Sequence, residues 1–215
     1  MRISNLELEW TGHAGFFIDD KKKIYIDPYQ LSPGKEKADI ILITHSHYDH
    51  CSIEDLMKIV KDGTIIVCPA DCQSKITKLD ERIEIKNLEP EQEITIEGIR
   101  IKAVPAYNVN KKFHSKEEYW NGYIIEINEV RIYHAGDTDF IPEMTQLDKI
   151  DVALLPVGGL YTMNAEEAGK AVFMIKPKLA IPMHWGEIAG NYENALRFKE
   201  LCEQEGIECL ILEKR

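Results

Sequence analysis

Three histidines and one aspartate follow a single apolar run within a few positions of one another. The run Ile40–Ile43 leads through Thr44 to the side chains of His45, His47, Asp49 and His50. Neutral imidazole and carboxylate are the groups that bind zinc and neighbouring first-row metals. A tight loop at the end of a short buried strand would keep these groups close together. The stretch Asp39–Cys51 therefore predicts a metal site rather than a solvated polar loop.

The letters HSHYDH at residues 45–50 resemble the H-x-H-x-D-H signature of the metallo-β-lactamase superfamily. Three further segments follow the order of that family: Trp10–His13, His134–Thr138 and Pro182–Gly186. The whole set is most similar to the branch of metal-dependent hydrolases that includes the ascorbate-6-phosphate lactonases. The resemblance spans almost the entire chain and implies a metal-dependent hydrolase.

The resemblance implies a ligand set for one or two cations. One ion would lie on His45 and His47, a second on Asp49, His50 and His184, and Asp137 would be shared between them. Asp137 follows Gly136, which allows close backbone approach, and a carboxylate has two oxygens with which to bridge. Zinc is the first expectation, with manganese or iron as alternatives. His134 is expected to support the site without binding metal.

One position departs from the family pattern. Where the family places a third histidine on the first metal, this chain has Tyr107 or Asn108. Water, a phenolate or His114 from the following loop could complete that site, or only one ion is held. A phenol is a poor zinc ligand unless its high pKa falls sharply. What replaces the third histidine is left open by the sequence.

Two cations held in this way would support hydrolysis. Metal coordination lowers the pKa of bound water from 15.7 towards about 7, so a hydroxide nucleophile is available at neutral pH. Asp49 would orient that nucleophile, and His13, Tyr107, His114 and Tyr161 are candidate proton donors. The expected substrate is a small anionic ester, lactone or phosphodiester. The alternative is a metal-binding structural or regulatory protein of the same fold that has lost efficient catalysis.

The segment Asn108–Asn121 is basic and aromatic in an otherwise acidic chain. It carries Lys111, Lys112, His114, Lys116, Tyr119 and Trp120. Such a loop could form a lid that receives an anionic substrate. A solvated loop with an aromatic anchor fits the same letters equally well.

The elements that would position these residues alternate between hairpins and helices. Leu6–Trp10, Gly15–Ile18 and Lys23–Asp27 predict a β meander, and Arg82–Val104 predicts antiparallel hairpins on a second sheet. Helices are expected over Ile53–Val60, Ala165–Ile175 and Tyr192–Glu205. We therefore predict an α/β protein with one domain over residues 1–215. Its fold would be a four-layer αββα sandwich of two mixed β-sheets flanked by helices.

Composition narrows the classes of partner. The formal net charge of −11 argues against a protein that binds nucleic-acid backbones, because that binding depends on Lys and Arg. No apolar run reaches membrane-spanning length, the N-terminus lacks the apolar core of a signal peptide, and the five cysteines form no disulfide framework. We expect a cytoplasmic protein that acts on a small molecule without membrane contact, and whose sheet edges could pair subunits into a homo-oligomer.

Overall fold

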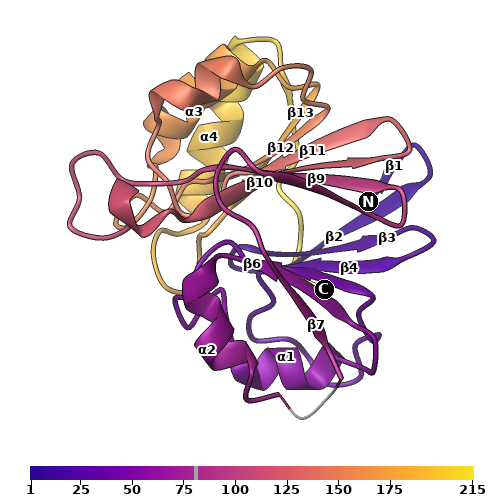
Figure 1. Ribbon diagram of the computed structural model, residues 1–215. Coiled ribbons are helices and arrows are strands. Elements are labelled where there is room, and N and C mark those ends of the chain that lie inside the picture. Colours follow the sequence, from indigo (N-terminus) through magenta and orange to yellow (C-terminus); the bar gives the residue numbers. More distant parts are fainter. Residues whose placement is uncertain (80–81) are drawn as a thin grey trace. The chain divides into compact units, whose positions relative to one another are not determined.

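The computed structural model describes residues 1–79 and 82–215. Its internal contacts divide it into two compact units, Met1–Glu89 with Glu213–Arg215, and Pro90–Leu212. Each unit is built on one seven-stranded mixed β-sheet in which the strands follow one another in chain order. Helices pack against each sheet (Figure 1). These elements confirm the predicted fold class, whereas the single domain stays a prediction.

The sheet of the first unit begins as an antiparallel meander and ends as a parallel sheet. Strands β1 to β4 pair antiparallel, and β4 to β7 pair parallel. The strands are β1 (Arg2–Ile3), β2 (Leu6–Gly12), β3 (Gly15–Asp19), β4 (Lys23–Ile26), β5 (Ile40–Leu42), β6 (Ile65–Cys68) and β7 (Glu84–Asn87). The expected meander is therefore confirmed.

Short helices join the parallel strands of the first unit: α1 (Ile53–Ile59), the 3₁₀ turn η1 (Ala70–Cys72) and α2 (Gln73–Ile76). Ser52 caps α1 by accepting a hydrogen bond from the main-chain nitrogen of Asp55. The apolar side of α1 then buries Leu56 and Ile59 in a core that also contains Ile41 and other β-strand side chains. This packing fixes the loop between β5 and α1, which carries the histidine motif.

One predicted strand assignment is wrong. Residues 84–87 were expected on the second sheet with the hairpins that follow, but β7 pairs parallel with β6 in the first sheet. The connection through η1 and α2 explains the difference, since parallel neighbours need a long crossover whereas hairpins need only a turn. The antiparallel hairpins of the second sheet begin at β8.

The second unit repeats the same succession of pairings. Strands β8 to β11 pair antiparallel and β11 to β14 pair parallel. The strands are β8 (Glu93–Ile96), β9 (Ile99–Pro105), β10 (Asn121–Ile127), β11 (Val130–His134), β12 (Val152–Pro156), β13 (Leu179–Met183) and β14 (Glu208–Cys209). The helical elements are η2 (Lys116–Glu118), η3 (Pro142–Gln146), α3 (Ala165–Ile175) and α4 (Tyr192–Gln204).

Helices α3 and α4 lie side by side in the second unit (Figure 1). Each begins with a capping box, in which an asparagine side chain and the residue three positions later satisfy each other's main-chain nitrogen atoms. The asparagines are Asn164 for α3 and Asn191 for α4. The predicted Asn164 cap and the predicted bounds of α3 are confirmed, and the α4 prediction is one residue too long at its C-terminal end.

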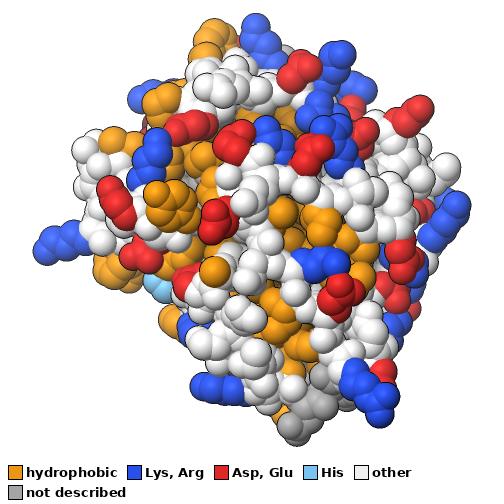
Figure 2. All heavy atoms as spheres, in the orientation of Figure 1, with side chains coloured by type: hydrophobic (Ala, Val, Ile, Leu, Met, Phe, Trp, Pro, Cys, Tyr) orange, Lys and Arg blue, Asp and Glu red, His pale blue; other side chains and the backbone are white. Residues whose placement is uncertain are grey.

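The charged residues, the cysteines and the helices of the described residues can be compared with the expectations from composition. On the face that Figure 2 shows, acidic and basic side chains are interspersed rather than gathered into a basic stripe. All five cysteines are buried as free thiols. A search of the described helices finds none whose length and apolar character would let it cross a bilayer.

Candidate metal centre

The first group of candidate ligands lies in the loop that follows β5. His45 Nε2 and His47 Nδ1 are 3.1 Å apart, and the rings of His45 and His50 have centroids 4.0 Å apart. Two imidazole nitrogens bound to one zinc at about 2.0–2.1 Å are separated by roughly 3.0–3.4 Å in a near-tetrahedral site. The observed separation of His45 and His47 therefore fits two ligands of one cation.

Asp49 is held between two histidines in the same unit. Its Oδ2 atom is 2.9 Å from His13 Nε2 and 3.6 Å from His50 Nε2, and all three residues are buried. His13 lies in the turn between β2 and β3 with a left-handed φ of 50°, and its carbonyl accepts a hydrogen bond from Trp10 Nε1. The structure thus brings the predicted loop histidine into direct contact with the predicted catalytic aspartate.

Asp27 belongs to this group although its sequence context suggested only a strand end. It is fully buried after β4, and its Oδ2 atom lies 2.8 Å from His50 Nδ1. Thr44 donates to the same carboxylate through its main-chain nitrogen at 2.8 Å and through its hydroxyl at 2.6 Å. A carboxylate on Nδ1 fixes the ring orientation and makes Nε2 the ligand nitrogen. Like Asp49 and Asp137, Asp27 stands just beyond a strand, and that position was the only sequence signal.

The second unit gathers its own buried group around Asp137. The Oδ2 atom of Asp137 is 3.2 Å from His114 Nε2 and 3.2 Å from His184 Nε2. The exposed fractions are 3% for Asp137, 4% for His114 and 1% for His184. Donor atoms about 3 Å apart can share one cation when each lies about 2 Å from it. The group therefore fits a divalent metal with nitrogen and oxygen ligands.

Strand ends and left-handed turns place these three side chains. Asp137 follows β11 after Gly136, and His184 follows β13. Gly136 and His184 have φ angles of 65° and 57°, which turn the chain sharply at the end of each strand. Because β11, β12 and β13 run parallel, their carboxyl ends meet at one edge of the sheet. Asp137 and His184, both predicted as metal ligands, therefore lie together in this unit.

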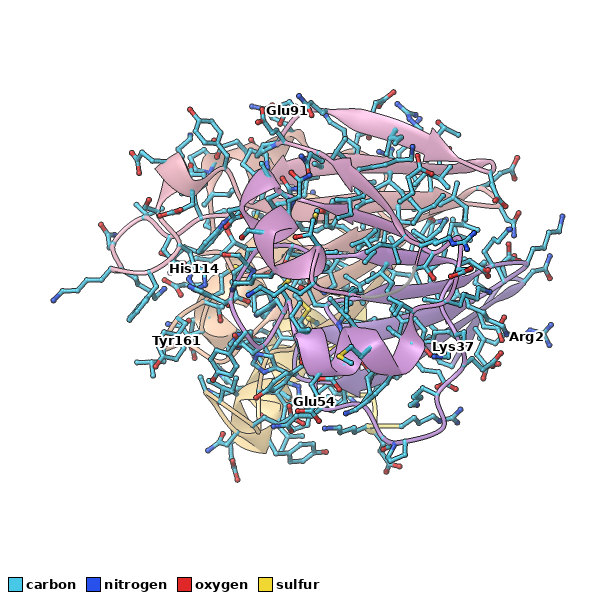
Figure 3. The ribbon with its side chains drawn as sticks, turned by 60° about the horizontal axis from the view of Figure 1, so that its bottom comes forward. Arg2, Lys37, Glu54, Glu91, His114 and Tyr161 are labelled. Carbon is cyan, nitrogen blue, oxygen red and sulfur yellow. The ribbon has the colours of Figure 1, made fainter. Side chains whose placement is uncertain are left out.

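His114 reaches Asp137 from the loop between β9 and η2, where Figure 3 labels it. The loop folds back because the main-chain nitrogen of Asn108 donates to the His114 carbonyl at 2.7 Å. The Asn108 side-chain nitrogen lies 3.2 Å from His114 Nδ1, and Trp120 contacts the ring edge-on at 5.4 Å. Of the alternatives left open for the missing third histidine, the structure thus brings His114 to the buried aspartate.

Tyr107 is directed to another set of partners. Its hydroxyl donates to Glu143 at 2.9 Å, and Lys116 Nζ lies 4.6 Å from the centre of its ring. Burial and the hydrogen bond to Glu143 raise the pKa of Tyr107, so a phenolate is disfavoured. The expectation that Tyr107 could complete the site or donate a proton there is corrected by this arrangement.

The basic loop is largely neutralised by its own neighbours. Lys111 forms an ion pair with Asp139, and Lys116 pairs with Glu143 at 2.8 Å. Phe113 is 50% exposed and packs edge-on against Tyr161 at 5.1 Å. Lys111 and Lys116 are therefore engaged with carboxylates, which weakens the expectation that they receive an anionic substrate.

His134 has the supporting position expected from the sequence. It is fully buried at the end of β11, and its Nδ1 atom accepts a hydrogen bond from the main-chain nitrogen of Gly136 at 3.2 Å. This bond lies inside the turn that delivers Asp137. His134 thus stabilises the backbone of the ligand turn.

Comparisons with known proteins agree with this chemistry. Residues 7–184 match the family model of the β-lactamase superfamily domain. A UPF0173 metal-dependent hydrolase from Thermoplasma acidophilum is 37% identical over 221 aligned positions, covering 98% of this chain and 97% of the relative. A crystal structure assigned as a metal-dependent hydrolase from Parabacteroides distasonis is 34% identical with a TM-score of 0.87, covering 98% of this chain and 94% of that one.

A third comparison adds an archaeal structure. The metallo hydrolase Igni18 from Ignicoccus hospitalis is 25% identical with a TM-score of 0.79, and the match covers 97% of this chain and 95% of that one. The extent of the family match and the identity to full-length relatives settle the assignment. The chain belongs to the metallo-β-lactamase superfamily and, within it, to the UPF0173 metal-dependent hydrolases.

Proposed function

We propose that this hydrolase cleaves a small anionic ester, lactone or phosphodiester with the help of one or two divalent cations, zinc first among them. The proposed ligands in the first unit are His45, His47, Asp49 and His50. Those in the second unit are His114, Asp137 and His184. Manganese and iron suit the same nitrogen and oxygen donors and are the alternatives to test. Cytoplasmic localisation and self-association stay predictions.

The observation that carries the proposal is the buried trio in the second unit. Asp137 stands 3.2 Å from the ligand nitrogens of both His114 and His184. A buried carboxylate is costly unless its charge is balanced, and a divalent cation balances it while using both imidazoles as ligands. We therefore add His114 to the ligand set inferred from the sequence, in the role of the missing third histidine.

This addition removes the basis of the alternative function. A structural or regulatory protein was considered because the first metal appeared to lack one imidazole. With His114 available as a ligand, the donor set has the nitrogen and oxygen atoms that a catalytic centre requires. Membership among metal-dependent hydrolases favours the enzyme as well.

The chain's own residues then have defined tasks. A bound divalent cation would supply Lewis-acid activation of the scissile bond and of water. Asp49 lies at hydrogen-bond distance from His13 and is the candidate to orient water and accept its proton. His13 holds the Asp49 carboxylate in place, and Asp27 holds His50. Tyr107 is engaged with Glu143, so we assign it no proton transfer.

The substrate class rests on charge and size. Metal ions are the largest local positive charges in such a site and would attract an anionic group even though Lys111 and Lys116 are already paired. The exposed Phe113 and the half-buried Tyr161, which pack against each other, offer an apolar surface beside His114. A compact anion with an apolar part suits both features.

The test is metal reconstitution followed by substrate screening. The metal-stripped protein is titrated with zinc and with manganese, and each form is assayed on phosphodiester, lactone and carboxylic ester panels. We expect bound metal, turnover of at least one class, and loss of turnover in Asp49→Ala. Asp62→Ala is the control, because Asp62 is an exposed residue outside both ligand groups. Metal binding without turnover on any of the three classes would contradict the proposed function.

A further inference from the structure

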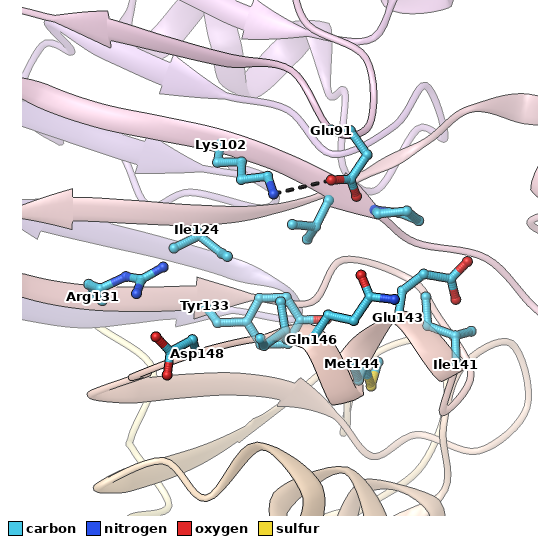
Figure 4. Close-up of a pocket in the computed structure, with 13 residues that line it drawn as sticks. Glu91, Lys102, Ile124, Arg131, Tyr133, Ile141, Glu143, Met144, Gln146 and Asp148 are labelled. Carbon is cyan, nitrogen blue, oxygen red and sulfur yellow. Dashed lines mark ion pairs between the residues drawn. The ribbon is translucent and has the colours of Figure 1, made fainter.

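A cavity separate from the candidate metal ligands lies on the sheet of the second unit (Figure 4). Its volume is about 140 Å³, and its walls come from β9, β10, β11 and the η3 segment. Lys102, Ile124 and Tyr133 stand in one row across three strands, as the pairings of Ile124 with both neighbours show. Arg131 lies two residues before Tyr133 and so projects from the same face of the sheet. None of the proposed metal ligands is among the residues that line this cavity.

Tyr133 places a buried hydroxyl in the lining of the cavity. The residue is 1% exposed and lines the cavity. Burial raises the pKa of this hydroxyl, so it keeps its proton at neutral pH and can act as a donor. A protonated hydroxyl in a cavity lining can donate a hydrogen bond to a ligand atom there.

Arg131 provides an unsatisfied donor in the same lining. Its Nε atom is buried and has no hydrogen-bond partner in the described part of the chain. The carboxylate of Glu126 approaches this atom only to 3.9 Å, which is beyond hydrogen-bond distance. A guanidinium group presents its N–H donors in a planar fork that matches two carboxylate oxygens.

The acidic residues of the lining mostly have partners of their own. Glu91 pairs with Lys102 at 3.1 Å across the cavity rim, as the dashed line in Figure 4 shows. Glu143 pairs with Lys116 at 2.8 Å. Asp148, the third acidic residue, is exposed to solvent. Because Asp148 is solvated, the groups that face the cavity interior are chiefly the donors of Arg131 and Tyr133, and these suit an acceptor.

The remaining walls are apolar. Ile124, Ile141 and Met144 are buried side chains that line the cavity. An apolar cavity of about 150 Å³ in another protein is large enough to bind benzene. The size and lining of the present cavity therefore suit a ligand with a body of similar size and one acceptor group.

We propose that this cavity binds a small organic carboxylate whose apolar body is about the size of a benzene ring. The body packs against Ile124, Ile141 and Met144. The carboxylate oxygens accept hydrogen bonds from the Tyr133 hydroxyl and the Arg131 guanidinium. The site lies outside the proposed metal ligands, so it does not depend on the proposed hydrolytic function.

The test uses the metal-loaded, full-length protein labelled with 3-fluorotyrosine. The ¹⁹F signal of Tyr133 is assigned by its loss in Tyr133→Phe, and benzoate is titrated with benzamide and benzylamine as neutral and cationic counterparts. We expect benzoate to shift the Tyr133 signal with saturation, and benzamide and benzylamine to bind at least tenfold more weakly. Following one assigned signal separates this site from benzoate bound at the metals.

Two variants measure the assigned contacts. Arg131→Gln is expected to weaken benzoate binding about 10-fold to 100-fold, as loss of a charged hydrogen bond does, with the Tyr133 signal still visible. Tyr133→Phe is expected to weaken it about 2-fold to 10-fold, measured by ligand-observed NMR. Arg197→Gln is the control, because Arg197 lies on α4 outside the lining and pairs with Glu166. Thermal melting checks that each variant is folded.

Three results would overturn the proposal. In the first, the Tyr133 signal does not respond to benzoate at concentrations up to tens of millimolar. In the second, benzamide binds as tightly as benzoate. In the third, Arg131→Gln melts as the wild type does and binds benzoate with unchanged affinity.

Discussion

The carboxylate of Asp27 lies 2.8 Å from Nδ1 of His50, and both side chains are fully buried. The two residues are 23 positions apart in the chain and meet because β4 and β5 are parallel neighbours, with Ile26 opposite Leu42. Asp27 directly follows β4, and Thr44 lies two residues after the end of β5. The register of these two strands therefore places Asp27 beside Thr44 and the loop that carries His50. His50 is therefore oriented before any ligand arrives.

Replacement of Asp27 should weaken metal binding without removing a proposed ligand. Asp27→Asn keeps the shape of the side chain but loses the negative charge that Nδ1 of His50 and the two Thr44 donors face. We expect metal affinity to fall about 10-fold to 100-fold, as for other groups that hold ligand histidines. Competition with a chromogenic chelator measures it, and unchanged affinity would exclude the orienting role. Asp62→Asn, at an exposed site, is the matched control.

Replacement of His114 should weaken metal binding, whereas replacement of Tyr107 should not. His114→Ala should lower metal affinity by more than about 100-fold, because it removes a proposed ligand rather than a supporting group. Tyr107→Phe should leave metal affinity within about twofold, because the hydroxyl that it removes bonds to Glu143 and not to a proposed ligand. Loss of this hydrogen bond should lower the free energy of unfolding by only about 1 kcal/mol. Metal stoichiometry by elemental analysis and affinity by competition distinguish the two. A strong loss in Tyr107→Phe with none in His114→Ala would reverse the assignment.

The acid sensitivity of α1 can be predicted from Asp55. Burial acts to raise the pKa of Asp55, but hydrogen bonds from Ser52, Lys58 and the main-chain nitrogens of Leu31 and Gln30 outweigh it and lower the pKa. A carboxyl group with a lowered folded-state pKa stabilises the protein above its unfolded pKa of about 3.9, and this contribution is lost as pH falls through the folded value.

Asp55→Asn should therefore destabilise the protein at pH 7 and matter less in acid. We expect a loss of roughly 1–3 kcal/mol at pH 7, because the variant leaves buried donors poorly matched. The difference from the wild type should shrink below about pH 4. Urea unfolding at a series of pH values measures it, and a difference that grows towards low pH would contradict the assignment.

The capping box of α3 sets a fourth expectation. Asn164 Oδ1 accepts from the Glu167 main-chain nitrogen at 2.9 Å, and the Glu167 carboxylate accepts from the Asn164 main-chain nitrogen at 2.9 Å. Asn164→Ala should lower the free energy of unfolding by about 1 kcal/mol. Lys170→Ala, an exposed change in the same helix, should alter it by less than about 0.5 kcal/mol. Equal effects of the two changes in urea unfolding would argue against the cap.

Local sequence patterns predicted those parts of the molecule that depend on neighbouring residues. The run before His45 predicted a strand, Ser52 and Asn164 predicted helix starts, and the histidine motif predicted a metal site whose ligands His45 and His47 lie 3.1 Å apart. Each of these signals lies within a few positions of the structure it determines. For the same reason the bounds of α3 agree with the prediction at both ends.

Features that depend on distant residues could not be predicted in the same way. Asp27 resembles an ordinary strand end until the parallel pairing of β4 and β5 sets it beside Thr44. His114 is a lone loop histidine until the loop folds back on Asn108. Whether β7 joins the first or the second sheet depends on whether the segment before it forms a crossover. The helices η1 and α2 in that segment are too short to produce a clear helical pattern in the sequence. In each case register or loop conformation decides the outcome.

The two units share a further regularity in their order of strand pairing. In each unit three antiparallel pairings are followed by three parallel ones, so β4 corresponds to β11 and both are followed by a buried aspartate. Duplication of an ancestral half-length gene would produce this repeated order of strand pairings. On that view Ala135 holds the place of Asp27, because each follows the last paired residue of its strand and donates its main-chain nitrogen to the next parallel strand, Asp27 to Leu42 and Ala135 to Leu154. The buried acids Asp27 and Asp137 would then have arisen separately in the two halves.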